Sequence, residues 1–522
     1  MNKNLGACLN VKNNELYVEE VSAADLAKNY GTPIFVMSES QIRANYKRFH
    51  AAFSNHWKGK SVDILPAIKA NWIQAVRDVL TQEGAGCDIF SEGELEIALR
   101  SGAKPEKISV NGGGKSENYI QKCIETGVRI TVDDIDEIYL IDKVAARIGK
   151  RAAVRFRLRP QIPNAWQASD FSLEVVPVDM AFQVYKSGVP SEYIVELAKF
   201  AHESDHIDLK GFHIHIGRHH RSFGVWRNLL RGYCELLVLL RKELGGYEPE
   251  EIDIGGGFPT PRDPFFKKVN RWDIPLTAVL WCVFPLLNFF GLQYRYSFMQ
   301  TILSTHAKMQ KKARRAPEIE QYAQVTCETL NEELSKSGFD ISKMILQVEP
   351  GRSFYSDAGI HLTKVDKIKT QTKPIKWNWV LTDTSYFFFS GGVFEFNKHD
   401  FVVANKVADP MQMYADIVGK SCYADRIIPE VNLPKIEQGD LIAILDAGAY
   451  QEVSASNFNA LPRPATVMVN KSQSAVIRKA ESVQDVLSRD QSPPWMEDIV
   501  ANGQMSDPRK EQSHSSVSPP AV

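Results

Sequence analysis

Strand-like and helix-like segments alternate through the first two thirds of the chain, and this alternation limits the folds that it can adopt. Strands that alternate with helices form a parallel sheet, and eight or so such units over about 300 residues predict a closed (β/α)8 barrel. The predicted strands are Asp63–Ala67, Cys87–Phe90, Lys107–Val110, Val128–Val132, Ala153–Leu158, Gly211–Ile216, Glu251–Ile254 and Met344–Val348, and the predicted helices include Glu92–Ser101, Ser116–Thr126 and Ile135–Ile148.

A different pattern begins after Glu349. Strand-like runs now follow one another with only turns between them, which predicts an antiparallel β-domain. These runs are His361–Ile368, Trp379–Thr382, Phe401–Val403, Leu441–Ile444 and Ala465–Val469. Beyond about residue 485 the chain is polar and rich in Pro and Ser, which is typical of a disordered tail. We therefore expect an N-terminal segment that joins the β-domain (1–37), a barrel (38–355) with an insert at about 262–322, a β-domain (356–484) and a tail (485–522).

Composition excludes several classes of function. The 522-residue chain has a formal net charge of −1 and a pI near 6.9, so nucleic acid is not expected as its partner. Its seven cysteines are scattered and show no CxxC spacing, which indicates free thiols in a reducing compartment and argues against disulfides and zinc. The N-terminus shows no apolar signal core, so a cytoplasmic location is expected.

The insert contains an apolar stretch, Ile274–Phe290, that is interrupted by Pro275 and Pro285 and followed by basic residues at 308–315. Such a stretch is short for a membrane span. Two readings stay open, a helical subdomain packed on the barrel or on a dimer partner, and a patch at 274–315 that lies on a membrane surface.

One lysine stands where a barrel strand would present a nucleophile. The stretch Pro66–Asn71 follows the strand that begins at Asp63, and it places Lys69 at the C-terminal mouth of the barrel. Ile68 and Ala70 flank this lysine, and poor solvation would lower its pKa and free its amine to form an imine. The alternative is an ordinary lysine that reaches into solvent from the end of a strand.

Three further motifs also follow predicted strands. Gly255-Gly256-Gly257 lets backbone N–H groups close around a phosphate, although such a turn can be only a turn. Glu349-Pro350-Gly351-Arg352 places a carboxylate and a guanidinium together, either as a site or as a local ion pair. His213 and His215 share one face of a strand. A metal site would require a third ligand in register, and the following Arg218-His219-His220 offers histidines but no carboxylate, so no metal is expected.

Together, an imine-forming lysine, a phosphate-binding turn, a carboxylate and a histidine describe a site for pyridoxal phosphate. The lysine carries the aldehyde, the glycines hold the phosphate, and the carboxylate keeps the ring nitrogen protonated so that the ring accepts electrons.

The chain resembles the fold-type III pyridoxal-phosphate decarboxylases, the group of diaminopimelate and ornithine decarboxylases. Its C-terminal motifs are more similar to the diaminopimelate branch. The resemblance implies an alanine racemase-like architecture, with a TIM-like barrel and a C-terminal β-domain. The matching motifs are Tyr30–Pro33, Pro66–Asn71, Gly86–Leu95, His213–Gly217, Gly255–Gly257, Glu349–Arg352, Asp446–Tyr450 and Asn457–Pro464.

The resemblance implies pyridoxal phosphate as the cofactor and a role for each matching residue. Lys69 would hold the cofactor through an imine, His215 would stack on its ring, and Glu349 would pair with its ring nitrogen. Asp88 and Arg157 would lie near the cofactor and Lys69. The phosphate would be bound by Gly257, Arg352 and Tyr450, and the cofactor-binding set would be completed by Gly255, Gly256 and Gly351.

The resemblance also implies that Cys422 reaches into the partner subunit's site and protonates the substrate carbon after CO₂ leaves. The functional unit would then be a homodimer with shared active sites. The alternative is that Cys422 is a small buried hydrophobe.

Several departures from the family concern the substrate. Diaminopimelate decarboxylases carry a glutamate just after this cysteine, whereas the chain reads Cys422-Tyr423-Ala424-Asp425. They also carry an arginine after the strand near Thr382, and the stretch up to Phe389 has none. A site that lacks the partners of both distal charges should bind diaminopimelate badly. The substrate-binding candidates are Arg352, Tyr386, Tyr423 and Asp425.

Two other stretches also depart from the family. Arg218 replaces a serine that helps to hold the phosphate, and an arginine could bind phosphate as well. The segment from Gln161 to Gly188, with Trp166 and Phe171, and the run Phe387–Phe389 suggest a larger or more apolar substrate side chain, although this run could be core.

The sequence therefore predicts decarboxylation of an amino acid or amino-acid conjugate other than diaminopimelate, through Lys69. Two alternatives remain, an amino-acid racemase or epimerase that uses the same barrel and cofactor, and a non-catalytic homologue that binds a protein partner.

Overall fold

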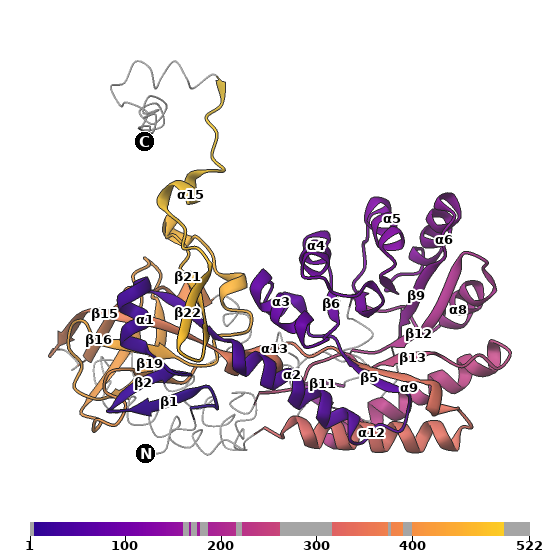
Figure 1. The fold of residues 1–522 in the computed structure, drawn as a ribbon, viewed down its shortest axis with the longest axis horizontal. Helices are drawn as coiled ribbons and strands as arrows, with labels where there is room; N and C mark the ends of the chain where they lie inside the picture. The colour runs from indigo at the N-terminus through magenta and orange to yellow at the C-terminus, as the bar shows by residue number, and fades with distance from the viewer. Residues whose placement is uncertain are drawn as a thin grey trace, which may run out of the picture.

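The computed structural model describes residues 5–159, 166–168, 175–177, 186–215, 222–260, 316–373, 377–389 and 399–494. Two bodies lie side by side in Figure 1, a barrel surrounded by helices and a second body that is rich in strands. The second body contains strands from both ends of the chain, because Leu16 and Val18 of β2 (Glu15–Val18) pack in one cluster with Ile360 and Leu362 of β15 (Gly359–Gln371).

Eight parallel strands form the first sheet, in the order β5-β14-β13-β12-β9-β8-β7-β6. A parallel bridge between Ala67 and Asp88 connects the first strand region to the last, so the ring is nearly closed. The strands are β5 (Ser61–Ile64), β6 (Cys87–Ile89), β7 (Ile108–Val110), β8 (Arg129–Val132), β9 (Ala152–Arg157), β12 (Ile207–His213), β13 (Glu251–Asp253) and β14 (Ile345–Val348). The predicted barrel is thus confirmed.

Helices cover the outside of this ring and begin and end where the sequence supplies caps. Ser91 and Ser116 accept N-terminal backbone N–H groups of α4 and α5, and Gly127 and Gly149 end α5 and α6 in the left-handed conformation. The covering helices are α2 (Glu39–Ser54), α3 (Gln74–Gln82), α4 (Glu92–Arg100), α5 (Glu117–Thr126), α6 (Glu137–Ile148), α8 (Ile194–Glu203), α9 (Phe223–Glu243) and α12 (Ile319–Lys336).

Apolar residues of strands and helices pack into one continuous core in the barrel. All four residues of β8 are buried, as is expected for a parallel strand that is covered on both faces. Lys69 and Glu349 lie just beyond the carboxyl ends of β5 and β14, at the mouth of the barrel.

The second sheet has nine strands in the order β19-β18-β16-β15-β4-β21-β22, with β20 joining β15 and β17. Most pairs are antiparallel, but β4 pairs with β21 and β16 with β18 in parallel. The strands are β4 (Ile34–Ser38), β15 (Gly359–Gln371), β16 (Trp377–Thr382), β17 (Phe401–Val403), β18 (Met413–Val418), β19 (Arg426–Leu433), β20 (Leu441–Ile444), β21 (Ala465–Asn470) and β22 (Gln473–Arg478).

Smaller elements complete the described chain. A three-stranded sheet and a helix lie at the N-terminus, and a short antiparallel pair lies in the segment after β9. These elements are β1 (Leu9–Lys12), β2 (Glu15–Val18), β3 (Val21–Ser22), α1 (Ala23–Tyr30), β10 (Trp166–Ala168) and β11 (Val175–Pro177). The predicted domain limits stay a prediction.

Several predicted segments lie wholly or partly outside the described residues. The apolar stretch 274–290, the basic stretch 308–315, Arg218 and Phe171 all fall there. The last residues of the predicted insert belong to α12, and the predicted tail begins inside α15 (Val483–Leu487). That helix forms because Ser482 and Asp485 build a capping box, which the composition of the tail does not reveal.

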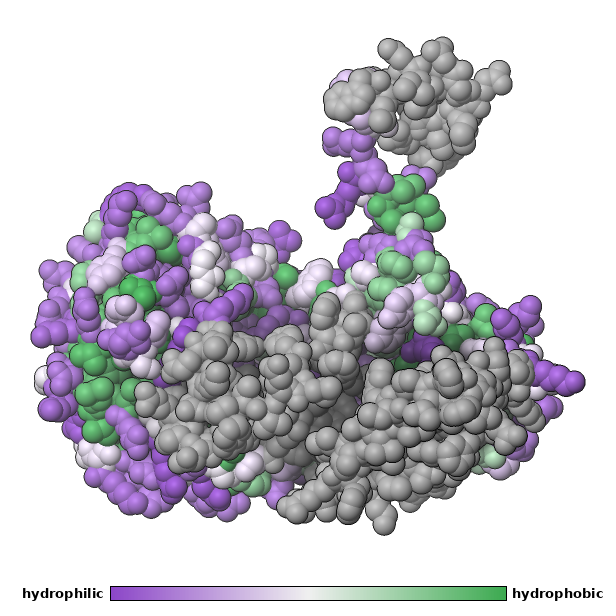
Figure 2. All heavy atoms as spheres, turned by 180° about the vertical axis from the view of Figure 1, so that it is seen from behind, coloured by the Kyte–Doolittle hydropathy of each residue, from purple (hydrophilic) through white to green (hydrophobic). Residues whose placement is uncertain are grey.

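Hydrophilic side chains cover most of the described surface that Figure 2 shows, and apolar ones form separate groups among them. Within the described ranges, no helix combines the length and the apolarity that crossing a membrane would require.

Candidate active site

Lys69 lies in a 3-10 turn, η1 (Ile68–Ala70), just beyond the end of β5. Its Nζ atom is 2.6 Å from Oδ2 of Asp88, which is buried on the adjacent strand β6. The Lys69 side chain is 48% exposed, whereas Ile68 and Ala70 are buried in the core. The structure thus brings the predicted lysine and the predicted aspartate together at the mouth of the barrel.

The expectation of a low pKa for Lys69 is wrong in direction. Desolvation lowers the pKa of this amine, but the charge and the hydrogen bond of Asp88, together with Tyr450 and Glu349, outweigh it, so the pKa of Lys69 lies above its ordinary value. The sequence neighbours Ile68 and Ala70 do not decide the result, because the controlling carboxylate comes from another strand. The free protein therefore holds Nζ protonated.

Asn111 connects this pair to a second carboxylate. It directly follows β7, and its side-chain amide donates to Oδ1 of Asp88 at 2.6 Å and to Oε1 of Glu349 at 2.7 Å. Asn111 is not among the predicted site residues, although it follows a predicted strand as Lys69 does. A continuous polar path therefore runs from Lys69 to Glu349.

Glu349 is buried after β14 and faces two nitrogen-bearing side chains. Arg155 donates from Nη2 to Oε1 at 2.7 Å, and His213 Nε2 lies 3.2 Å from Oε2. Burial raises the pKa of Glu349, but His213 and Arg155 lower it by more, so it lies well below its ordinary value. Because burial lowers the pKa of His213 to about 4, the lasting positive charge beside Glu349 is that of Arg155.

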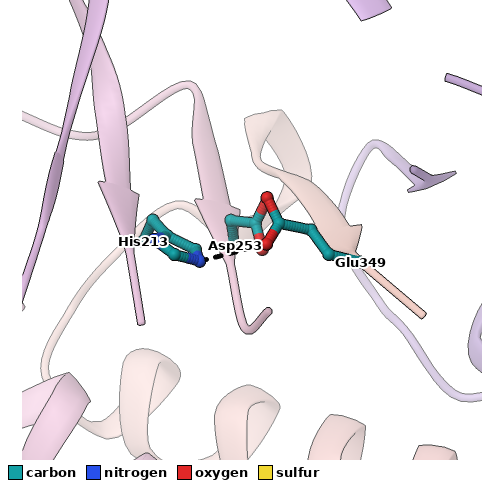
Figure 3. A group of neighbouring side chains, drawn as sticks. All are labelled: His213, Asp253 and Glu349. Carbon is teal, nitrogen blue, oxygen red and sulfur yellow. Dashed lines mark ion pairs between the residues drawn. The ribbon is translucent and has the colours of Figure 1, made fainter. Parts of the chain in front are cut away.

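Figure 3 shows His213 at the end of β12, Asp253 at the end of β13 and Glu349 directly after β14, with their side chains directed toward one another. One ligand atom of each lies within 4.8 Å of the others, a spacing that could hold a metal ion. This group is not evident from the sequence, because the three residues are far apart in the chain and come together only in the barrel. Arg155, however, donates to Asp253 at 2.5 Å as well as to Glu349. A guanidinium already bridges the two carboxylates, so we assign no metal here.

His215 is fixed in one orientation by the glycine turn. The backbone N–H of Gly256 donates to Nδ1 of His215 at 3.1 Å, so the imidazole carries its proton on Nε2. Burial lowers the pKa of His215 well below its ordinary value, and this histidine is neutral. Its ring is nearly parallel to that of His213, with centroids 6.4 Å apart. A neutral ring held flat is suited to stacking on an aromatic cofactor.

The glycine turn has a steric role that differs from the one predicted. The N–H groups of Gly255 and Gly256 donate to Asp253 Oδ1 and to His215. These two amides therefore serve the protein itself, which corrects the prediction that the whole turn faces a phosphate. A Cβ on Gly255 would lie 2.6 Å from His215 Nδ1, and one on Gly256 would overlap the carbonyl of Glu349. The close approach of three strand ends requires both glycines.

Tyr450 joins the barrel to the second body. Its backbone N–H donates to the carbonyl of Ala70 at 2.8 Å, and the Arg352 guanidinium lies 4.8 Å from the centre of its ring. A Cβ on Gly351 would lie 2.7 Å from its hydroxyl oxygen. Tyr450 itself has a φ of 64°, which is uncommon for a residue with a Cβ. The structure thus brings Gly351, Arg352 and Tyr450 together beside the lysine turn.

Arg157, which the resemblance places near the cofactor and Lys69, lies beside Asp133 and His215, and its role stays a prediction. Its Nη1 lies 3.7 Å from Oδ1 of Asp133, and its Nη2 donates to the carbonyl of His215 at 3.4 Å. The arginine that contacts Glu349 is Arg155, two positions earlier on the same face of β9. Because both arginines lie on one face of β9, the period of two does not decide which side chain reaches the carboxylates.

The loop that carries Cys422 is exposed and bordered by aromatic rings. Cys422 is exposed rather than a buried hydrophobe, and its N–H donates to Oδ1 of Asn459 at 2.8 Å. The rings of Tyr386 and Tyr423 are stacked with centroids 6.3 Å apart. Phe387 lies between Tyr423 and Phe458, with centroid distances of 5.6 and 4.0 Å. We call Tyr386, Phe387, Tyr423 and Phe458 the aromatic cluster.

Asp425, the remaining substrate-binding candidate, is 1% exposed and contacts backbone groups. Its carboxylate accepts the N–H groups of Tyr386 at 2.5 Å and of Ser421 at 2.6 Å. These contacts support a role in holding the Cys422 loop rather than in binding a substrate.

Comparisons with known proteins relate this chain to pyridoxal-dependent enzymes. Residues 39–270 match the family model described as "Pyridoxal-dependent decarboxylase, pyridoxal binding domain". Diaminopimelate decarboxylase of Archaeoglobus fulgidus is 28% identical over 493 residues, which cover 92% of this chain and 98% of the relative. The expectation that diaminopimelate is excluded receives no support from this relative.

Solved structures give the same result. The crystal structure of diaminopimelate decarboxylase from M. jannaschii is similar with a TM-score of 0.76 and 26% identity, covering 94% of this chain and 98% of that one. The same enzyme in complex with L-lysine gives a TM-score of 0.75 and 26% identity, with 94% and 99% coverage.

Proposed function

Because the chain belongs to the fold-type III pyridoxal-phosphate-dependent decarboxylases, on the diaminopimelate branch, we propose that it releases the α-carboxylate of an amino acid as CO₂, with Lys69 as the residue that holds the cofactor. The observation that carries this proposal is the pair of Lys69 and Asp88 at 2.6 Å, linked through Asn111 to the buried Glu349. When bound, pyridoxal phosphate supplies an electron sink for the electron pair that CO₂ leaves behind.

The residues of the mouth fit this cofactor. Glu349 is ionised and can accept a hydrogen bond from a protonated ring nitrogen, and His215 can cover one face of the ring. The N–H groups of Gly255 and Gly256 already donate to Asp253 and His215. We therefore assign phosphate binding to Gly257, Arg352 and Tyr450. Arg352 supplies the positive charge that a phosphate requires.

Asp88 prepares Lys69 for its reaction. The amine is protonated in the free protein and must lose a proton before Nζ can act as a nucleophile. Burial raises the pKa of Asp88, and its Oδ2 atom lies close enough to Nζ to accept that proton. Asn111 holds the other oxygen of Asp88 at 2.6 Å and so fixes the direction of the transfer.

The substrate proposal is an amino acid or amino-acid conjugate with an apolar or aromatic distal end. The stretches 381–389 and 419–425 contain two tyrosines, no arginine and no glutamate, and their rings form the aromatic cluster beside Cys422. Such a surface offers apolar area rather than partners for a distal ammonium and carboxylate. The named substrate of the relatives, diaminopimelate, is therefore the first compound to test against it.

Cys422 is proposed as the donor that returns a proton to Cα, from one subunit to the site of its partner. Its exposure on a loop of the second body supports action across an interface between two copies. The functional unit would then be a homodimer with shared sites.

A panel of amino acids tests these proposals in one assay. The purified protein is loaded with pyridoxal phosphate and incubated with diaminopimelate, L-lysine, aromatic amino acids and amino-acid conjugates, with Lys69→Ala as the control. We expect CO₂ release from an aromatic or conjugated substrate, and none from the variant. Release from diaminopimelate alone would overturn the substrate proposal. Loss of optical purity without CO₂ would indicate a racemase, and failure to bind the cofactor would leave a non-catalytic homologue.

A further inference from the structure

The second body contains a pocket of about 170 Å³, and none of the described residues that line it belongs to the barrel mouth. Its floor is formed by buried side chains of two core clusters, with Ile34 and Ala465 from one and Phe388 from the other. The pocket therefore opens onto the apolar interior where these two clusters meet. Since about 10–15 Å³ is enough for one water molecule, the pocket has room for a small organic molecule.

Three prolines give this pocket stiff walls. Pro33 directly precedes β4, and Pro464 directly precedes β21, with Pro462 two positions earlier. A proline ring fixes its own φ, and β4 and β21 are hydrogen-bonded neighbours in the sheet. The pocket is therefore formed before a ligand binds, and little free energy is lost in ordering the protein around one.

The rim of the pocket is polar and carries an excess of positive charge. Arg463 and Glu481 form an ion pair, in which Arg463 donates from its backbone N–H and from Nε, each at 2.8 Å. Asn457 donates to the same carboxylate at 2.6 Å. Lys420 is exposed at the rim, and among the residues that the structure describes no acid lies within ion-pair distance of its amine. The Lys420 amine is therefore the charge that the rim offers to a ligand.

This distribution of groups favours a ligand with an apolar body and one carboxylate. The apolar body would cover the floor, and the carboxylate would lie at the rim beside Lys420. A free amino acid fits less well, because its ammonium would need an acid of its own. Glu481 is the one acid in the described lining, and its oxygens already accept from Arg463 and Asn457.

We propose that this pocket is a binding site for a small monocarboxylate with an apolar body, whose carboxylate pairs with Lys420. The inference goes beyond the proposed function and depends neither on pyridoxal phosphate nor on the reaction at the barrel mouth. Lys420 stands two positions before Cys422, and Phe388 follows Phe387 of the aromatic cluster. A bound acid would therefore contact the Cys422 loop and the turn η7 (Tyr386–Phe389) together.

Three probe compounds separate the apolar contribution from the charged one. Phenylacetate carries both groups, phenylacetamide lacks the charge, and acetate lacks the apolar body. Titrations of the full-length protein, followed by ligand-observed NMR, should give the highest affinity for phenylacetate. We expect phenylacetamide to bind about fivefold more weakly, the upper range for an exposed ion pair. Acetate should bind about tenfold more weakly or worse, because it buries no ring.

Two variants and a chemical footprint locate the bound acid. Lys420→Met should reduce the affinity for phenylacetate about fivefold, and Ala480→Phe should remove detectable binding because a ring at this lining position fills the pocket. Both positions are exposed, so neither change disturbs the core. Lys435→Met is the matched control, since Lys435 is an exposed lysine of the same body outside the pocket.

The footprint uses the wild-type protein. Phenylacetate should slow the acylation of Lys420 by an N-hydroxysuccinimide ester, measured by mass spectrometry, and should leave the acylation of Lys435 unchanged. Because this measurement needs no variant, it tests the inference even if Ala480→Phe does not fold.

Several results would overturn the inference. Equal affinity for phenylacetate and phenylacetamide, or unchanged affinity in Lys420→Met, would show that the carboxylate does not pair with Lys420. Binding that persists in Ala480→Phe, or a lack of protection at Lys420, would place the acid elsewhere in the protein, and the absence of binding to the wild type would remove the site.

Discussion

The backbone N–H of Tyr450 donates a hydrogen bond of 2.8 Å to the carbonyl oxygen of Ala70, the residue after Lys69. The side chain of Asn71 adds a second link, from Nδ2 to the carbonyl of Gly448 at 3.0 Å. The turn that carries the proposed nucleophile is therefore held by the second body of the molecule. Neither body alone contains the complete site.

The hydrogen bond of Asn71 to Gly448 should support both the stability of the fold and the binding of the cofactor. Asn71→Ala removes the donor to the buried carbonyl of Gly448, and we expect it to lower the free energy of unfolding by about 1–3 kcal/mol and to weaken binding of pyridoxal phosphate. Asn331→Ala is a matched control, because Asn331 is buried and donates to the carbonyl of His56 on the outer helices. Both variants should lose stability in chemical denaturation, and an equal loss of cofactor affinity in both would contradict the account.

Asp88 should influence the pH at which Lys69 reacts with pyridoxal phosphate, because it raises the pKa of this lysine. Its charge and hydrogen bond raise the pKa of Lys69, so Asp88→Asn should lower that pKa. The rate at which pyridoxal phosphate attaches to the protein, followed by absorbance against pH, should then rise at lower pH than in the wild type. A profile that is unchanged, or that moves to higher pH, is incompatible with this role.

His361 should make the protein less stable in acid, because burial lowers its pKa. It is buried between Phe35 and Phe389, and burial lowers its pKa to about 3. The folded protein keeps it neutral, whereas the unfolded chain takes up a proton below about pH 6.5, so stability falls as the pH falls from there toward the folded value. At pH 5 the loss is about 2 kcal/mol for one such group.

His361→Gln should reduce this loss because glutamine does not titrate. Denaturation at pH 7 and pH 5 measures it, with the exposed His50 on α2 changed to Gln as the control. Identical pH dependence in the wild type and in His361→Gln would refute the assignment.

Asp425 should limit the accessibility of Cys422, because it holds the loop that carries this cysteine. Its carboxylate accepts two backbone N–H groups of the loop and its neighbour, so Asp425→Ala should loosen this segment and speed the reaction of Cys422 with a thiol reagent. Cys8, Cys87, Cys123, Cys234 and Cys327 are buried. Mass spectrometry of the labelled peptide follows the rate, and Asp425→Asn, which retains one acceptor and tolerates the φ of 46°, should lie between. Equal rates in all three proteins would exclude the proposed support.

The backbone of the site leaves no room for a side chain at position 256. A Cβ there would overlap the backbone carbonyl of Glu349, which cannot move without shifting β14. Gly256→Ala should therefore reduce cofactor affinity and thermal stability together. Gly224→Ala is the control, since its Cβ would meet Ser222 Oγ only at 3.5 Å, near the start of α9. Wild-type affinity in Gly256→Ala would show that the close approach is not needed.

The barrel and part of the site could be predicted because both follow from local sequence. The barrel strands are apolar runs that alternate with segments of helical periodicity. Lys69 and Glu349 follow two of these runs closely, and the carboxyl ends of parallel strands lie together at the mouth of a barrel. The relationships between strands could not be predicted. The pKa of Lys69 depends on Asp88, and the choice of Arg155 over Arg157 depends on side-chain reach within the barrel.

The central claim is that this chain holds pyridoxal phosphate on Lys69. The most direct test loads the purified protein with the cofactor, reduces it with borohydride to fix any bond between the aldehyde carbon and a lysine, and maps the modified peptide by mass spectrometry. The account predicts one modified peptide, that of residues around Lys69, and none in Lys69→Ala. Modification of another lysine, or of none, would contradict it.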